Sequence, residues 1–165
     1  TTSDGATVDA WFAKLATAAD TSIVGNSTLS DNLHLHISEW SDMGDAWSLH
    51  QLGTPTQATS TATTLAAPSV TTTIADALAL CGWSFTGGLP GTTNTYTNSF
   101  TTLSANQRGR TAYKILSATG AVTSTHTWST ARTAIAQTLV LVPGTSGGGG
   151  GGGSLYYSAG PIRFG

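Results

Sequence analysis

Two histidines and one glutamate, His34, His36 and Glu39, are the side chains whose types and spacing come closest to a metal site. Residues 31–40 alternate between polar and apolar types, so a strand there places both imidazoles on one face, and zinc accepts such ligands. Glu39 lies an odd number of positions away and faces the opposite side unless the strand bulges. We therefore interpret the segment as a polar stripe that faces solvent or an interface, and we expect no metal and no other cofactor.

The other motifs that could bind a ligand or catalyse a reaction are weaker candidates. Asp42 and Asp45 enclose a Met-Gly pair and would offer oxygens to calcium, but their ligand density fits a hairpin turn better. A serine nucleophile of the hydrolase type needs a strained strand-to-helix turn, which the sequence does not offer. The glycines at 147–153 lack the Lys and Ser/Thr that complete a phosphate-binding loop. We expect no catalytic residues, and hence not an enzyme.

Five tryptophans raise the alternative of a surface that stacks on sugar rings. Tryptophans of a β-sandwich more often pack in the core or at an interface, so packing is the favoured interpretation and glycan binding stays an alternative. These residues are Trp11, Trp40, Trp47, Trp83 and Trp128.

The composition limits the partners. Of 165 residues only 8% are charged and the net charge is −2, so the chain has no basic surface for nucleic acid or an anionic membrane. Its polar surface comes instead from 31 Thr and 18 Ser, and threonine is at home on a pleated sheet. A weakly charged surface resists self-association poorly, so we expect a protein that sits against other subunits.

Alternating patterns dominate the chain and predict an all-β antiparallel sandwich. Alanines make residues 8–19 resemble a short helix, but the similarity of residues 10–22 to residues 111–122 favours a strand there too. Clusters of Gly, Pro, Asn and Asp separate the patterns, as turns do. The predicted strands lie at 31–40, 46–52, 54–65, 76–85, 93–103, 110–116, 122–128 and 132–142.

Several short motifs together resemble a known family. They are Trp11 to Ala19 with His36-Ile37-Ser38-Glu39-Trp40-Ser41, Ala67 to Thr73, Ala77 to Leu80, Tyr113-Lys114, and Leu139-Val140-Leu141-Val142-Pro143. This set resembles the Thr/Ser-rich, jelly-roll-like β-sandwich modules of phage virion structural proteins, over about residues 6 to 143. The resemblance implies a jelly-roll-like sandwich with a structural role, and it supplies no catalytic residues.

The composition changes sharply after Pro143. We predict a sandwich domain over 1–144, a Gly-rich tether over 145–154 and an aromatic C-terminal arm over 155–165, because a run of glycines does not fold alone. The arm is too apolar for a free tail, so we expect it to dock on a neighbouring subunit, and we expect a chain without residues 146–165 to stay folded. Its interface residues are Leu155, Tyr156, Tyr157, Ile162, Arg163 and Phe164.

The resemblance and the arm together predict a structural protein of a phage particle. The favoured role is a capsid decoration protein or another subunit of the virion surface, with the major capsid protein or further copies of itself as partners. A glycan-binding module of a phage tail or cell-surface appendage is one alternative. A subunit of an extracellular filament is another.

Overall fold

The computed structural model describes residues 9–16, 36–41, 47–86, 89–105, 108–143 and 154–161, and every element in these ranges is a β-strand. All strand pairs in the registers are antiparallel. The prediction of an all-β antiparallel sandwich is confirmed, and the jelly-roll connectivity stays a prediction. The alanine-rich segment forms β1 (Asp9–Ala16), a strand and not a helix.

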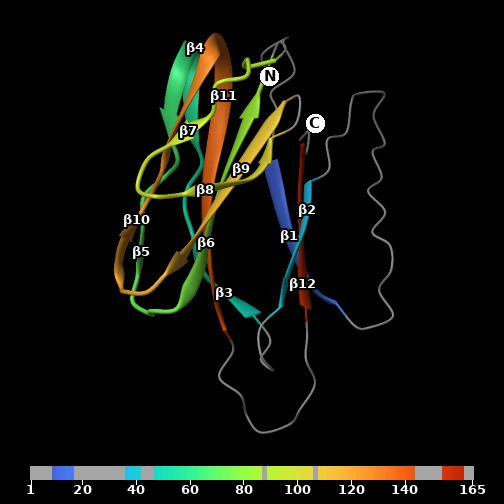
Figure 1. Ribbon diagram of the computed structural model, residues 1–165, viewed down its shortest axis with the longest axis vertical. Helices are drawn as coiled ribbons and strands as arrows, with labels where there is room; N and C mark the ends of the chain where they lie inside the picture. Colours follow the sequence, from blue (N-terminus) through green and yellow to red (C-terminus); the bar gives the residue numbers. More distant parts are fainter. Residues whose placement is uncertain are drawn as a thin grey trace, which may run out of the picture.

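A seven-stranded sheet forms the body of the molecule (Figure 1). Its central path runs through five strands, and two more pair with the longest of them, β11. In the order of the sheet the five are β3 (Trp47–Leu52), β11 (Thr125–Pro143), β6 (Ala77–Phe85), β9 (Gly109–Leu116) and β8 (Thr101–Ala105); the two additional strands are β4 (Thr56–Ala66) and β7 (Thr95–Tyr96).

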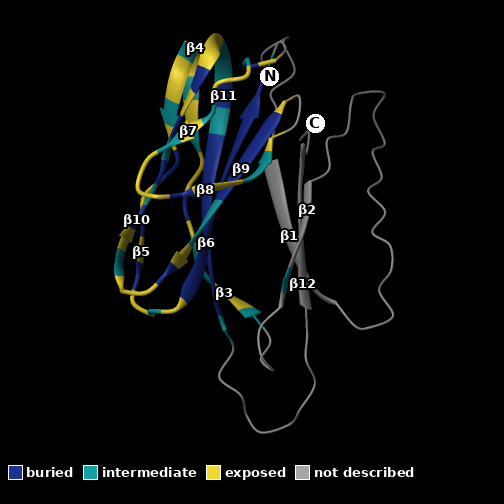
Figure 2. Ribbon diagram, in the orientation of Figure 1, coloured by how far each residue is buried: buried dark blue, intermediate teal, exposed yellow. Residues whose placement is uncertain are grey.

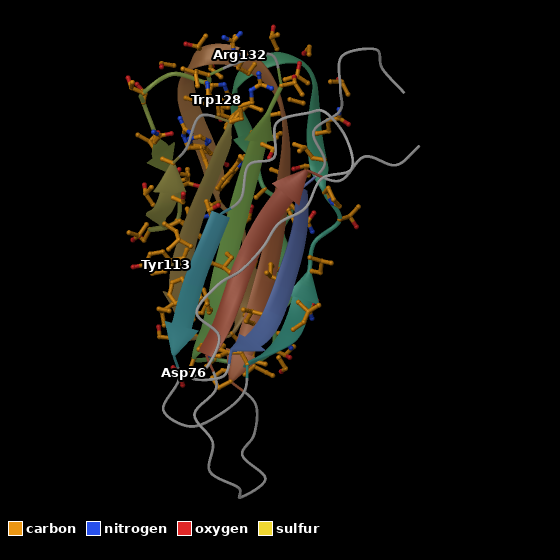
Figure 3. All side chains as sticks on the ribbon, turned by 90° about the vertical axis from the view of Figure 1, so that its right-hand side faces the viewer. Asp76, Tyr113, Trp128 and Arg132 are labelled. Carbon is orange, nitrogen blue, oxygen red and sulfur yellow. The ribbon has the colours of Figure 1, made fainter. Side chains whose placement is uncertain are left out.

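Two smaller sheets flank this body. A three-stranded sheet contains β1, β12 (Ser154–Pro161) and β2 (His36–Ser41), with β12 in the middle. It lies over one face of the large sheet, as Figures 1 and 3 show from two directions. A two-stranded sheet of β5 (Val70–Thr72) and β10 (Gly120–Val122) lies on the other side of the large sheet (Figure 1).

Strand β6 shows why the large sheet needs a layer on each face. All nine of its residues, Ala77 to Phe85, are buried, which matches their largely apolar sequence (Figure 2). Ala77, Ala79, Cys81, Trp83 and Phe85 belong to the larger core, which continues to residues of β5 and β10. Leu78 and Leu80 belong to a smaller core, with Leu139 and Leu141 of β11. Alternate residues of β6 therefore face different cores: its small and aromatic side chains face the larger core, and its leucines face the smaller one.

The predicted strands at 93–103, 122–128 and 132–142 have different boundaries in the structure. The first is two strands, β7 and β8, because Asn98 and Ser99 adopt positive φ angles of 59° and turn the chain. The other two belong largely to one strand, β11, which continues through residues 129–131. Its pairing with β4 shifts register between Thr127 and Arg132, which breaks the alternation that marks a strand in sequence.

The segment predicted as an arm contains a strand of the fold itself. Residues 154–161 form β12, which pairs with β1 along its whole length and with β2 over residues 154–159. The three-stranded sheet therefore extends past the predicted domain boundary at residue 144. A chain without residues 146–165 lacks β12, the strand that joins β1 to β2. We therefore expect this truncation to lower the stability of the folded protein.

Candidate interaction surface

Two rows of large apolar residues cross the face of the large sheet that the three-stranded sheet covers. Leu141 of β11 is paired with Leu78 of β6 and with Leu49 of β3, and Leu78 is paired in turn with Ile115 of β9. Directly paired residues lie on the same side of an antiparallel sheet, so each row is continuous. The second row contains Leu52, Leu139, Leu80 and Tyr113.

An irregularity in β3 brings both of its leucines to this face. Leu139 pairs with Leu52 and Leu141 pairs with Leu49, so β3 has one residue more than β11 between these pairs. Leu49 and Leu52 are three positions apart and would face opposite sides of a regular strand. The bulge corrects their parity and extends both apolar rows to the edge of the sheet.

The centre of this face is covered and its two margins are not. Leu78, Leu80, Leu139 and Leu141 are buried, and Trp40 of β2 packs against them. The Trp40 ring also meets Tyr113 edge-on, with 5.0 Å between ring centroids. At the margins Leu49, Leu52 and Ile115 remain 58%, 55% and 58% exposed. We call these three residues the apolar margin.

A second cluster of chemically capable side chains lies inside the larger core. His126 of β11 is fully buried and stacks on Tyr96 of β7, with 4.7 Å between ring centroids. Its Nε2 lies 3.1 Å from Oδ1 of Asn94, which also accepts a hydrogen bond of 2.7 Å from Nε of Arg110. Because an amide oxygen only accepts, Nε2 of His126 must carry the proton. Nδ1 is then unprotonated and can only accept a hydrogen bond, and it has no hydrogen-bond partner among the described residues.

The surroundings of His126 keep it neutral. Burial first, and then the positive charge of Arg110, lowers the pKa of His126 from 6.5 to about 4. Burial likewise raises the pKa of Tyr96, while Arg110 and the Thr102 hydroxyl act in the opposite direction. A general base must reach its substrate, and this imidazole is sealed beneath aromatic rings. The cluster is therefore a structural anchor.

What the cluster anchors is the 89–94 segment. Arg110 donates from Nη2 to the carbonyl of Gly91 at 3.1 Å, and the carbonyl of Pro90 accepts from the Thr130 backbone N–H at 2.8 Å. Arg132 donates from Nε to the carbonyl of Leu89 at 3.1 Å. The segment is thus tied to β9 and β11 at three successive residues.

Substituting Gly91 by alanine is expected to lower the free energy of unfolding by about 2 kcal/mol. Gly91 has φ of +94°, and an added Cβ would overlap the Oγ of Ser129. Gly120→Ala is the matched control, because Gly120 has φ of +138° with nothing within 4 Å of the added carbon. Urea unfolding of both variants separates backbone strain from steric overlap. Equal losses in the two variants would show that the overlap with Ser129 contributes nothing.

The structure describes two of the residues that the sequence raised as metal ligands. His36 and Glu39 lie in β2, where they pair with Ala159 and Tyr156 of β12. His34, Asp42 and Asp45 lie outside the described residues. Within the ranges that are described, no three His, Cys, Asp or Glu side chains gather as a metal site would require.

The predicted interface residues fall into two groups. Leu155, Tyr156 and Tyr157 lie in β12, at the centre of the three-stranded sheet. Ile162, Arg163 and Phe164 lie outside the described residues. Docking of the arm on a neighbouring subunit stays a prediction.

The four tryptophans whose burial the structure describes all lie in or against one of the two cores. Trp83 and Trp128 are buried in the larger core, and Trp40 and Trp47 are half-buried against the smaller one. All four rings therefore contribute to packing, and glycan binding stays an alternative. Trp11 lies in β1, where the structure gives its pairing with Ala159.

Sequence reasoning missed the apolar margin and the His126 cluster. The margin depends on the β3 bulge, which a pattern of Leu at positions 49 and 52 does not reveal. The cluster joins residues from three separate strands and a loop, and His126 carried a signal only through its alternation with Trp128.

Comparison with protein-family models, with curated proteins and with solved structures gives no match for this chain. The described part of the chain holds no helix with the length and apolar character needed to cross a membrane.

Proposed function

We propose that this protein is a structural subunit of a virus particle, a capsid decoration protein or another component of the particle surface. It acts by binding further virion subunits, and it performs no catalysis. Its partners are the major capsid protein or further copies of this chain. The virion assignment rests on the resemblance of its sequence motifs to phage structural modules.

The observation that carries the binding role is the apolar margin. Leu49, Leu52 and Ile115 continue the rows of the smaller core beyond the sheet that covers it. Exposed leucines that extend a core in register indicate a surface that another molecule covers. The low charge of the chain, 8% of residues, removes the repulsion that ordinarily keeps such surfaces apart.

Replacing both Leu49 and Leu52 by serine is expected to weaken self-association or particle binding at least tenfold with little change in stability, because both side chains are already exposed. Sedimentation across a concentration series measures self-association, and co-sedimentation with particles measures binding.

Leu89→Ser is the matched control. Leu89 is 54% exposed but lies beside Arg132, at the far end of the sheet from β3 (Figures 1 and 3). If Leu89→Ser weakened self-association or particle binding equally, the association would be nonspecific and hydrophobic. That result would contradict a specific role of the apolar margin.

The virion assignment has its own test. Mass spectrometry of purified particles should find the protein at a stoichiometry fixed relative to the major capsid protein. Immunogold labelling should then place it on the particle surface. Particles that lack the protein, although producing cells contain it, would refute the assignment.

A further inference from the structure

Strand β12 is the only described strand that pairs with β1 or with β2. Asp9 to Ala16 of β1 pair in continuous register with Pro161 to Ser154 of β12. On its other edge β12 pairs with β2 from His36 to Ser41, again without a shift. Removing β12 from its place would leave two facing strand edges with unpaired backbone groups, a slot that accepts one extended segment.

The connection to β12 constrains its choice of slot very little. Residues 144–153 separate the end of β11 from the start of β12, and seven consecutive glycines form most of them. Ten residues reach at most about 35 Å when extended. A glycine-rich chain of this length has a root-mean-square end-to-end distance of about 16 to 19 Å.

The composition of β12 also favours exchange. Its sequence, Ser-Leu-Tyr-Tyr-Ser-Ala-Gly-Pro, carries no charge. Natural proteins use charged residues to keep strands from pairing with the wrong chain, and β12 has none of them. A second copy offers the same β1 and β2 edges, so every backbone pair of the closed chain is reproduced between copies.

We propose that β12 of one copy inserts between β1 and β2 of a second copy, so that two chains exchange this strand. The proposal rests on the proposed function, because a particle surface holds copies side by side. The tether gives β12 an effective concentration of the order of millimolar at the slot of its own chain. Neighbouring copies in a particle reach similar local concentrations, so exchange competes with closure within one chain.

Cysteine pairs in the full-length chain test the exchange. Ala16 pairs with Ser154, so one chain carries Ala16→Cys and a second, differently tagged chain carries Ser154→Cys. The two chains are co-expressed and treated with a short bis-maleimide. The native thiol of Cys81 is buried, and burial raises its pKa to about 12, so it does not react.

Exchange predicts a covalent heterodimer whose yield rises with protein concentration. Ala10 pairs with Gly160 at the opposite end of β1, so Ala10→Cys with Ser154→Cys is the mismatched control and should give at least tenfold less product. The double variant Ala16→Cys with Ser154→Cys in a single chain measures closure within that chain. Full crosslinking there, with no heterodimer at any concentration or on particles, would overturn the proposal.

A second measurement covers the case in which the cysteine variants do not fold. Wild-type chains with two different tags, unfolded together and refolded at high concentration, should give dimers that persist after dilution. Light scattering that finds only monomers, with no co-purification of the tags, would also overturn the exchange. The two proposals fail separately: particles that contain closed chains refute exchange alone, and exchanged dimers that are absent from particles refute the virion role alone.

Discussion

Replacing Trp83 by alanine is expected to lower the free energy of unfolding by about 3 to 5 kcal/mol, the largest effect of any substitution considered. The side chain is 1% exposed, and its ring lies 5.4 Å from that of Tyr96 and 5.2 Å from that of His126. Its Nε1 donates to the carbonyl of Leu65 at 2.9 Å, which ties β4 to β6. Alanine removes the ring and also leaves that carbonyl without this donor.

Chemical denaturation of two further variants separates these contributions. Trp83→Phe keeps most of the apolar volume and loses the indole N–H, so it should cost clearly less than Trp83→Ala. Trp47→Ala removes a half-buried tryptophan that packs against the smaller core and should also cost less. A loss below about 1 kcal/mol in Trp83→Ala would show that the larger core does not depend on this ring.

Acid is expected to destabilise the protein through His126. The pKa of His126 is about 4 in the folded chain, against an ordinary 6.5, because burial and then Arg110 disfavour the charged ring. Below pH 6.5 the unfolded chain therefore takes up a proton that the folded chain refuses until about pH 4. The free energy of unfolding falls as the pH falls through this window, by about 3 kcal/mol in total.

Urea unfolding between pH 7.5 and pH 4 measures this dependence. His126→Gln keeps an amide N–H to donate toward Asn94 and does not titrate, so the difference from wild type isolates the histidine from the carboxylates. The variant should be less stable at pH 7 and lose less stability on acidification. Parallel curves for the two proteins would contradict the assigned role of burial.

The sequence predicted most strands because alternation and turn residues are local signals. β3, β4, β6 and β9 lie within a few residues of their predicted positions, and the Gly120 turn has the positive φ that its residue type allows. The continuity of β11 was missed because its register shift near residues 127–132 interrupts the local pattern. Such a shift depends on β4, which is distant in sequence.

The surface was harder to predict than the strands. Leu49 alternates with the polar residues Ser48 and His50, a pattern that predicts a half-buried strand, yet its side chain is 58% exposed. The placement of β12 shows the same limit. Its aromatic sequence predicted burial against a surface of a neighbouring subunit. Its pairing with β1 joins residues nearly 150 positions apart, roughly the whole chain.

The long strand β11 also determines when the strands of the large sheet can pair during synthesis. It pairs with β3, β4, β6 and β7, all of which precede it in the chain. About ninety residues separate Leu52 from its partner Leu139. At a synthesis rate of 5 to 20 residues per second, the strands made first wait roughly 4 to 18 seconds for that partner. A chain released from the ribosome before Thr125 lacks β11, the strand that joins β3, β4 and β7 to β6. Such truncated translation products are expected to be substrates for chaperones and proteases.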